Sequence, residues 1–302
     1  SSDLRDAEKL AIEEINATGG VLGKKIEIVE EDGRSNPNTF AERADKLLTV
    51  EGVNTIFGCW TSASRKAVKP IVEEHNALLW YPVQYEGMEA SPNIMYMGAS
   101  PNQQIVPAVD FCTEHFGNRM FLVGSDYVFP HTANLIIKAQ IASTDGKCVG
   151  EEYVKMGGQD FAEIVKKIKE TKPNIILNTL NGDSNVAFFA ELSKNDITCD
   201  IIPVMSFSIT ESEVSKMDIK SLAGNYVSWN YYETTQSLPN EKFVTAYKDT
   251  YGQDRMTGDP IEAAYIAVHM WALACEKAQS FDVEKVRIAS KGLSYVAPEG
   301  IV

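Results

Sequence analysis

The sequence predicts an α/β protein built from two doubly wound, Rossmann-like lobes, each with a mostly parallel sheet. Short apolar runs alternate with amphipathic segments at the intervals typical of βαβ units. This alternation restarts at Arg119, which indicates a second lobe of the same architecture. A chain of 302 residues with 44% hydrophobic content is long enough for two cores. Because no low-complexity linker is present, we expect several short crossings between the lobes.

The first lobe begins with a helix, because apolar residues recur at helical spacing from Leu4 to Ile15 and Gly19-Gly20 can end it. A central strand is expected at 77–81, where an apolar run stops at Pro82, which cannot donate to a sheet ladder. The same reasoning predicts strands at 25–30, 53–58 and 94–97 and helices at 38–50, 64–76 and 102–116.

The second lobe repeats the pattern, with strands expected at 120–124, 148–154, 175–178 and 201–205 and helices at 130–143, 161–171 and 184–195. A strand-like run at 224–232 is long enough to leave one lobe and enter the other. Three helices follow without a strand between them, so we expect them to pack on the first lobe; they are predicted at 240–251, 260–278 and 283–291. The predicted lobes are 1–118 plus 234–290 and 119–233 plus 291–302, with a ligand cleft between them.

Charge and composition exclude several classes of function. The formal charge of −14 argues against nucleic acid or an anionic membrane as a partner. No apolar run is long enough to insert directly into a membrane, and no signal peptide is present in this chain. Five widely scattered cysteines are interpreted as buried small residues. The acidic balance is compatible with an exported, periplasmic or extracellular protein.

Catalytic and metal-binding motifs are missing from the sequence. Three of the four histidines fall within predicted helices, and His131, at a helix start, has no GxSxG motif to accompany it. Neither HExxH nor an EF-hand loop occurs, and Gly19 to Gly23 end a helix where a phosphate loop would open one. The sequence therefore predicts a non-enzyme with no metal and no cofactor.

Aromatic and short polar side chains follow the predicted strands, at the edge where open α/β sheets bind ligands. We expect a pocket lined by aromatic residues of these loops, although a core position is the alternative for each; they are Trp60, Tyr81, Tyr85, Tyr127 and Phe129. Ser62 or Ser64 is expected to cap the following helix, which would expose its amides to a carbonyl oxygen or carboxylate.

Seven segments of the sequence resemble the urea-binding proteins of bacterial urea ABC transporters: 58–68, 81–87, 91–94, 101–104, 124–130, 178–189 and 259–265. These are type I periplasmic binding proteins, related to receptors for short-chain amides and branched-chain amino acids. The resemblance implies two lobes, joined by three crossings, that close over a small neutral ligand, urea or a short amide. It also implies delivery to the membrane subunits of an ABC permease. Family members carry a further strand before Leu4 and a strand pair after Ile301, and this chain is expected to lack both.

The resemblance also implies a ligand site. In the amide sensors, tyrosines stand at the positions of Trp60 and Phe129, and a threonine at Val83, so the pattern favours urea over aliphatic amides. Trp60, Tyr81 and Tyr127 are expected to form walls, with Ser62 and nearby amides facing the urea oxygen. Glu86, Asp126 or backbone carbonyls are expected to accept from the nitrogens. The full predicted set is Trp60, Thr61, Ser62, Tyr81, Val83, Gln84, Tyr85, Glu86, Asp126, Tyr127, Phe129, Asn178, Asn181, Ser206 and Asn230.

Three alternatives stay open at this point. The same site could belong to a sensory domain coupled to a signalling protein. An amidohydrolase would need a metal or a nucleophile that the sequence does not show. Short amides or branched-chain amino acids could replace urea as the ligand, and an amino acid would need charge partners for its ammonium and carboxylate groups.

Overall fold

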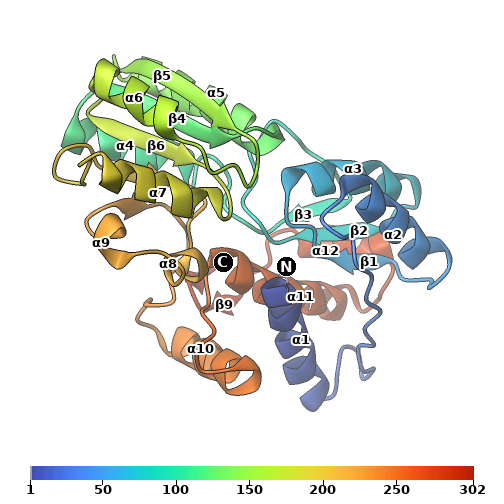
Figure 1. Cartoon of the computed structure of the whole chain (residues 1–302). Coiled ribbons are helices and arrows are strands. Elements are labelled where there is room, and N and C mark those ends of the chain that lie inside the picture. The colour runs from blue at the N-terminus through green and yellow to red at the C-terminus, as the bar shows by residue number, and fades with distance from the viewer. Residues whose placement is uncertain (1) are drawn as a thin grey trace. The chain divides into compact units, whose positions relative to one another are not determined.

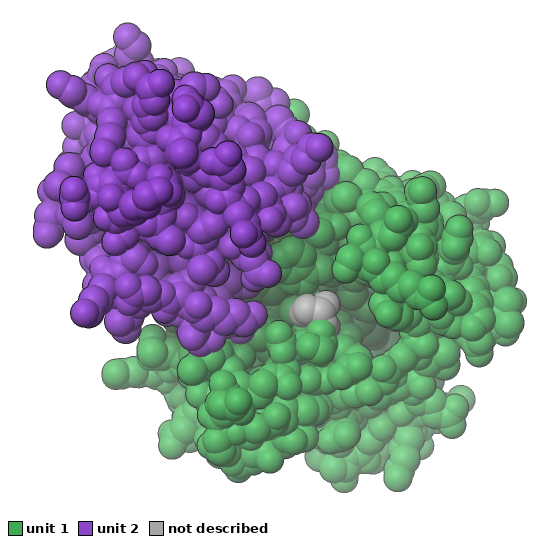
Figure 2. Space-filling view, in the orientation of Figure 1, with its two compact units in different colours: residues 1–98, 231–302 green, residues 99–230 purple. Residues whose placement is uncertain are grey.

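The computed structural model describes residues 2–302 and divides into two compact units (Figure 2). Unit 1 consists of Ser1–Gly98 and Tyr231–Val302, and unit 2 of Ala99–Asn230. Three predicted boundaries need correction, because residues 99–118 belong to unit 2, and residues 231–233 and 291–302 belong to unit 1. The prediction assigned 99–118 by its position before the restart at Arg119, but this segment packs against the sheet that follows it.

Unit 1 contains a three-stranded parallel sheet in the order β1-β2-β3, with β1 at Thr55–Phe57, β2 at Leu78–Tyr81 and β3 at Ile94–Tyr96. All four residues of β2 are buried, as expected for a central strand read from a continuous apolar run. The preceding helices are α1 (Ser2–Ala17), α2 (Pro37–Thr49) and α3 (Ser62–Glu74). The sheet and these helices confirm most of the elements predicted for the first half of the chain.

The predicted strand at 25–30 is wrong. Residues 25–30, all described by the structure, form no strand, and the backbone of Ile26 is bound by a side chain instead. The Asn16 amide accepts from the Ile26 N–H at 2.7 Å and donates to the Ile26 carbonyl at 2.9 Å. Ile28 and Val29 are each 44% exposed. Although apolar residues alternate along this segment, no strand of the described chain lies beside it to form a sheet.

Unit 2 contains a five-stranded parallel sheet in the order β5-β4-β6-β7-β8, and Figure 1 shows β5, β4 and β6 side by side. Its strands are β4 (Arg119–Ser125), β5 (Lys147–Val154), β6 (Ile175–Thr179), β7 (Val204–Ser206) and β8 (Tyr226–Val227). The predicted strands at 201–205 and 224–232 are thus shorter than expected. Only two residues of the second run find a partner, at the edge of the sheet beside β7.

Helices cover both faces of this sheet, which makes unit 2 doubly wound as predicted. Met120 and Leu122 of β4 pack with α4 and α5, whereas the alternate residues Phe121 and Val123 pack with α6 and α7. This division follows from the two-residue period of a strand. The four helices are α4 (Ile105–Phe116), α5 (Val128–Ser143), α6 (Ala162–Thr171) and α7 (Ser184–Lys194); two short helices, α8 (Glu211–Val214) and α9 (Ile219–Leu222), follow β7 and were not predicted.

The last third of the chain returns to unit 1, as predicted, with α10 (Leu238–Tyr251), α11 (Asp259–Ala278) and α12 (Val283–Ser290). Helix α11 lies beside α1 although the two are far apart in sequence (Figure 1). An antiparallel pair, β9 (Val296–Ala297) and β10 (Gly300–Ile301), was not predicted. Within residues 2–302, none of the helices combines the length and the apolar character needed to cross a membrane.

Candidate functional site

The loops that follow β1 and β2 leave the same edge of the unit 1 sheet, because the strands are parallel and Phe57 pairs with Trp80. Two hydrogen bonds tie the loop after β1 to the end of β2. The Gly58 amide donates to the Trp80 carbonyl at 3.2 Å, and the Tyr81 hydroxyl donates to the Trp60 carbonyl at 3.2 Å. Cys59 adopts a left-handed conformation with φ of 64°, which turns the chain sharply after β1. Predicted residues from two separate segments therefore meet at one edge.

Thr61, and neither of the two serines predicted for the role, caps helix α3. Its side-chain oxygen accepts a hydrogen bond from the Ser64 amide at 3.1 Å, which is the usual N-cap geometry. Ser62 is the first residue of the helix and is buried. This corrects the predicted cap by one residue and leaves the Ser62 hydroxyl available for another partner.

That partner is Glu86, in the loop after β2. The Ser62 hydroxyl donates to Glu86 Oε2 at 2.6 Å, and the Arg65 guanidinium donates to Glu86 Oε1 at 2.8 Å. Arg65 also donates from Nε to Glu89 at 3.0 Å, and Lys66 donates to the other oxygen of Glu89 at 2.8 Å. Exposure is 0% for Arg65, 1% for Glu86 and 2% for Ser62. The Ser62 hydroxyl was expected to face a ligand oxygen, whereas in the structure its proton is directed at a carboxylate.

Aromatic rings enclose the Arg65 guanidinium. Its central carbon lies 4.8 Å from the Tyr81 ring, 5.6 Å from the Tyr85 ring and 5.8 Å from the Tyr96 ring. Tyr85 stacks on Tyr96 with centroids 4.4 Å apart. Such contacts stabilise a cation that has lost its water. Although burial alone would raise it, the hydrogen bond from Lys66 and the charge of Arg65 lower the pKa of Glu89 to about 2.

Arg65 was not among the predicted site residues, although the sequence contains a signal for it. Arg65, Val68 and Val72 fall at i, i+3 and i+7, and all three are buried. An arginine on the apolar face of a helix requires acidic partners, which Glu86 and Glu89 provide.

The other predicted residues of unit 1 differ in how far they are accessible. Trp60, Thr61 and Tyr85 are half-buried. The side chains of Tyr81, Val83 and Gln84 are 0%, 5% and 5% exposed. Tyr81 therefore packs within the core of unit 1, with its hydroxyl tied to the loop of Trp60.

In unit 2, the predicted residues at the ends of β6 and β7 are hydrogen-bonded to one another. The Asn178 amide donates to Ser206 Oγ at 3.0 Å and to Asn185 at 2.9 Å, and accepts from the Leu180 N–H at 2.9 Å. Its exposure is 0%, so this amide secures the strand ends. The backbone N–H of Asn181 donates to Ser125 Oγ at 3.0 Å, which ties the end of β6 to the end of β4.

The loop after β4 places its predicted residues in different environments. Asp126 is exposed and lies 2.8 Å from His131, whose ring stacks on Tyr153 at 3.8 Å. Tyr127, at the N-terminus of α5, is half-buried, and so is Asn230. Phe129 is 2% exposed and packs among the core residues of unit 2, the alternative considered for it above.

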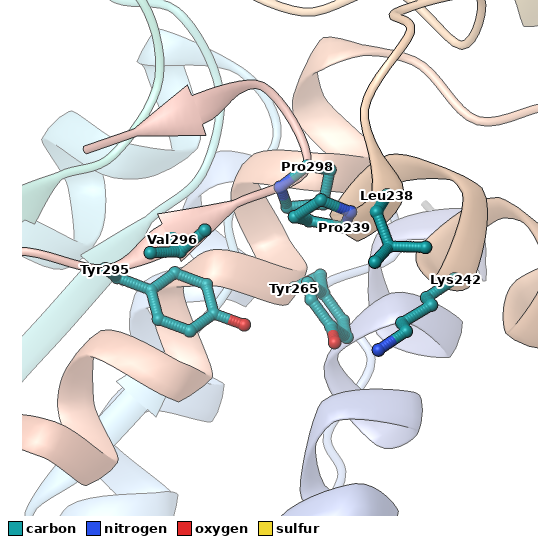
Figure 3. A pocket seen from close by; sticks show the side chains of 7 residues that line it. All are labelled: Leu238, Pro239, Lys242, Tyr265, Tyr295, Val296 and Pro298. Carbon is teal, nitrogen blue, oxygen red and sulfur yellow. The ribbon is translucent and has the colours of Figure 1, made fainter.

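A separate hollow of about 270 Å³ lies in unit 1, beside α10, α11 and β9 (Figure 3). None of the predicted site residues lines it; the lining residues are Leu238, Pro239, Lys242, Tyr265, Tyr295, Val296 and Pro298. The Tyr265 hydroxyl already donates to Glu14 at 2.6 Å. Among residues 2–302, no cluster of three or more histidine, cysteine or acidic side chains could hold a metal ion.

Comparison with known proteins adds the family. A family model described as a periplasmic binding protein domain matches residues 1–302. The chain belongs to the periplasmic binding protein family. This is a family of extracytoplasmic solute-binding proteins and not of enzymes, and the two parallel α/β units described above are of its type I fold.

Similar proteins support this membership over most of the chain. The Leu/Ile/Val-binding protein homolog 7 of Brucella melitensis is 42% identical over 304 residues, covering 93% of this chain and 74% of that protein. A solute-binding protein from R. palustris, solved in complex with 4-hydroxybenzoate, has a TM-score of 0.90 at 21% identity. The match covers 100% of this chain and 83% of the R. palustris chain. LivJ from Streptococcus pneumoniae, solved with isoleucine, has a TM-score of 0.87 at 18% identity, covering 99% and 85%. At these low identities the two structures show the fold alone.

Proposed function

We propose that this periplasmic binding protein captures a small neutral solute, with urea as the preferred ligand, and delivers it to an ABC permease. The observation that carries the proposal is the charge balance around Arg65. It is the one lysine or arginine that is buried among residues 2–302, and it is bound by two carboxylates, Glu86 and Glu89. Lys66, 2.8 Å from Glu89, supplies the second positive charge, so the charges of the four side chains sum to zero. A balanced group of this kind offers hydrogen bonds to a ligand without offering a free charge.

A charged ligand would need more than this edge provides. The first-turn amides of α3 could donate to the α-carboxylate of an amino acid, but its ammonium group requires a carboxylate of its own. At the unit 1 edge, the positive charge of Arg65 and the negative charge of Glu86 already satisfy each other at 2.8 Å. Urea is planar and neutral, so binding it leaves this pair undisturbed. The likeness of seven sequence segments to urea-binding proteins supports the same ligand.

The proposed contacts follow from the loops at the strand ends of each unit. Trp60 and Tyr127, both half-buried, provide flat walls for the planar solute, and the buried Tyr81 supports the loop of Trp60 from within unit 1. Amides of the first turn of α3 donate to the urea oxygen, because the start of a helix has unpaired N–H groups. Asp126 and backbone carbonyls are the proposed acceptors for the nitrogens, whereas both oxygens of Glu86 already accept from Ser62 and Arg65. Gln84 and Tyr85 complete the set in unit 1, and Asn178, Asn181, Ser206 and Asn230 complete it in unit 2.

A branched-chain amino acid is the second candidate, because relatives 42% identical to this chain are called Leu/Ile/Val-binding protein homologs. Coupling to a signalling protein would leave the same ligand contacts in place, and the neighbouring genes distinguish it from transport.

Isothermal titration of ligand-stripped protein with urea, acetamide and leucine in parallel tests the proposal. We expect saturable binding of urea and much weaker binding of the other two. Trp60→Ala should weaken urea binding at least about tenfold, since a buried aromatic contact of this size contributes more than 1.4 kcal/mol. Trp60→Phe keeps a flat ring and should lose less. Binding of leucine with no binding of urea would refute the proposed ligand.

A further inference from the structure

The direction of one buried hydrogen bond determines what the unit 1 edge can recognise. We propose that Arg65, acting through Glu86, fixes the Ser62 hydroxyl as a hydrogen-bond acceptor, so that this edge selects solutes that present an N–H group. The inference rests on the proposed function in one respect: it assumes that the ligand contacts the loop at Ser62. It assigns Glu86 a positioning role in place of direct contact with the ligand.

The direction of the bond follows from the chemistry of the three groups. A guanidinium has donors only, so the 2.8 Å contact requires Glu86 Oε1 to accept. Lys66 Nζ, also donor-only, lies 3.5 Å from the same oxygen. Both neighbours of Oε1 are donor-only groups, so Glu86 is the acceptor on this side, and the oxygens of a carboxylate accept. In the 2.6 Å contact between Ser62 Oγ and Glu86 Oε2, the proton must therefore come from Ser62.

What remains on Ser62 is a lone pair. A serine hydroxyl has one proton and two lone pairs. The proton is committed to Glu86, and one lone pair accepts from Arg65 Nη1 at 3.3 Å. The second lone pair can accept an N–H from a ligand, whereas a carbonyl or carboxylate oxygen placed there would meet another lone pair. Urea, with four N–H groups, satisfies this requirement, and a ligand that has only oxygen atoms does not.

The substitution Glu86→Gln reverses the polarity of Ser62 with little change in shape. Arg65 and Lys66 both face Oε1, so the glutamine must keep its oxygen there and place its NH₂ group where Oε2 was. That NH₂ group then donates to Ser62 Oγ, and the Ser62 proton is released to point elsewhere. The hydroxyl becomes a donor, which opposes an N–H ligand.

A double-mutant cycle measured by titration calorimetry with urea tests this positioning role. We expect Glu86→Gln to weaken urea binding about tenfold or more, in line with a lost hydrogen bond of this type. In the Ser62→Ala background, which has no hydroxyl to reverse, the same substitution should change affinity less than about threefold. Glu89→Gln is the matched control, because it alters the other carboxylate of Arg65 without touching Ser62 and should also stay within about threefold. Thermal unfolding confirms that each variant is folded.

The outcomes separate this inference from the proposed ligand. Equal losses from Glu86→Gln with and without the Ser62 hydroxyl, or no loss at all, would overturn the inference while leaving urea as the ligand. If the unmodified protein binds leucine and not urea, the proposed ligand fails, and the same cycle with leucine tests the inference, since an ammonium group is also an N–H donor. If the unmodified protein binds neither urea nor leucine, proton NMR tests the inference about Ser62. The inference requires a downfield, slowly exchanging hydroxyl resonance that Ser62→Ala and Glu86→Gln both abolish, and its absence would overturn the inference.

Discussion

Removing the charge of Arg65 should destabilise unit 1 more than removing any exposed ion pair would. We consider Arg65→Met, which keeps a long apolar side chain between Tyr81 and Tyr96 while removing the guanidinium. In the unmodified protein, Arg65 is 0% exposed and its partners Glu86 and Glu89 have side chains 1% and 5% exposed. The variant therefore leaves buried carboxylates without the cation that compensates them.

The magnitude follows from that burial. Removing one partner of a buried ion pair costs about 3–5 kcal/mol, chiefly because the remaining charge stays desolvated. Lys66 retains its bond to Glu89 at 2.8 Å and offsets part of this loss, so we expect about 3 kcal/mol. That is a large share of the roughly 5–15 kcal/mol by which folded proteins are stable. Adding Glu86→Gln and Glu89→Gln to Arg65→Met should recover part of the loss, because no uncompensated charge then remains.

Guanidinium chloride unfolding followed by tryptophan fluorescence is the suitable assay, since urea is the proposed ligand. Unit 1 contains Trp60, Trp80 and Trp271, so the signal reports mainly on that unit. Lys69→Met is the matched control, four residues further along the same helix, because its pair with Glu73 spans 4.0 Å between side chains 27% and 37% exposed and should contribute less than about 1 kcal/mol. Equal effects of Arg65→Met and Lys69→Met would refute the buried network.

Three further predictions concern the same strand ends. Asn178→Ala should cost about 2–3 kcal/mol in denaturant unfolding, because it leaves three buried hydrogen bonds unmade, and a loss below 1 kcal/mol would contradict this. Gly98→Ala should lower both stability and urea affinity, since the added carbon would lie 2.2 Å from the Val83 carbonyl carbon; unchanged affinity would count against the loop. The stability difference between the unmodified protein and Glu89→Gln should be constant above pH 4.5 and shrink as pH falls towards 2, because the folded-state pKa of Glu89 is depressed from 4.5 to about 2; a difference that does not shrink would be inconsistent with this pKa.

Much of the fold could be predicted from the sequence, because burial imposes a period on each element. Strands β2 and β4 each lie between two other strands, and helices cover both faces of β4, so both strands appear in the sequence as continuous apolar runs. The run at 25–30 also has a strand-like pattern but forms no strand, because pairing depends on a neighbour that local sequence does not specify. Likewise the short β9–β10 hairpin has too few residues for a period to show.

The position of the candidate site was easier to predict than the roles of its side chains. Strand order brings the loops after β1 and β2 to one edge whatever their composition, which is why Trp60, Ser62 and Glu86 could be grouped together. Whether an aromatic residue lines a site or fills a core depends on a few ångströms of packing. Phe129 lies in the core of unit 2, and its sequence context of polar neighbours gave no warning.

Arg65 shows how such roles can be derived once a single burial is known. Its position on the face of α3 shared with Val68 and Val72 places the guanidinium inside, and a buried guanidinium must find acceptors. Glu86 is then compelled to accept, and Ser62 is compelled to donate to Glu86. Because arginine has no acceptor atom, the hydrogen bonds from Arg65 to Glu86 and from Ser62 to Glu86 each have only one possible direction. The position of Arg65 on the buried face of α3 thus determines, through Glu86 and Ser62, that the solute must present an N–H group.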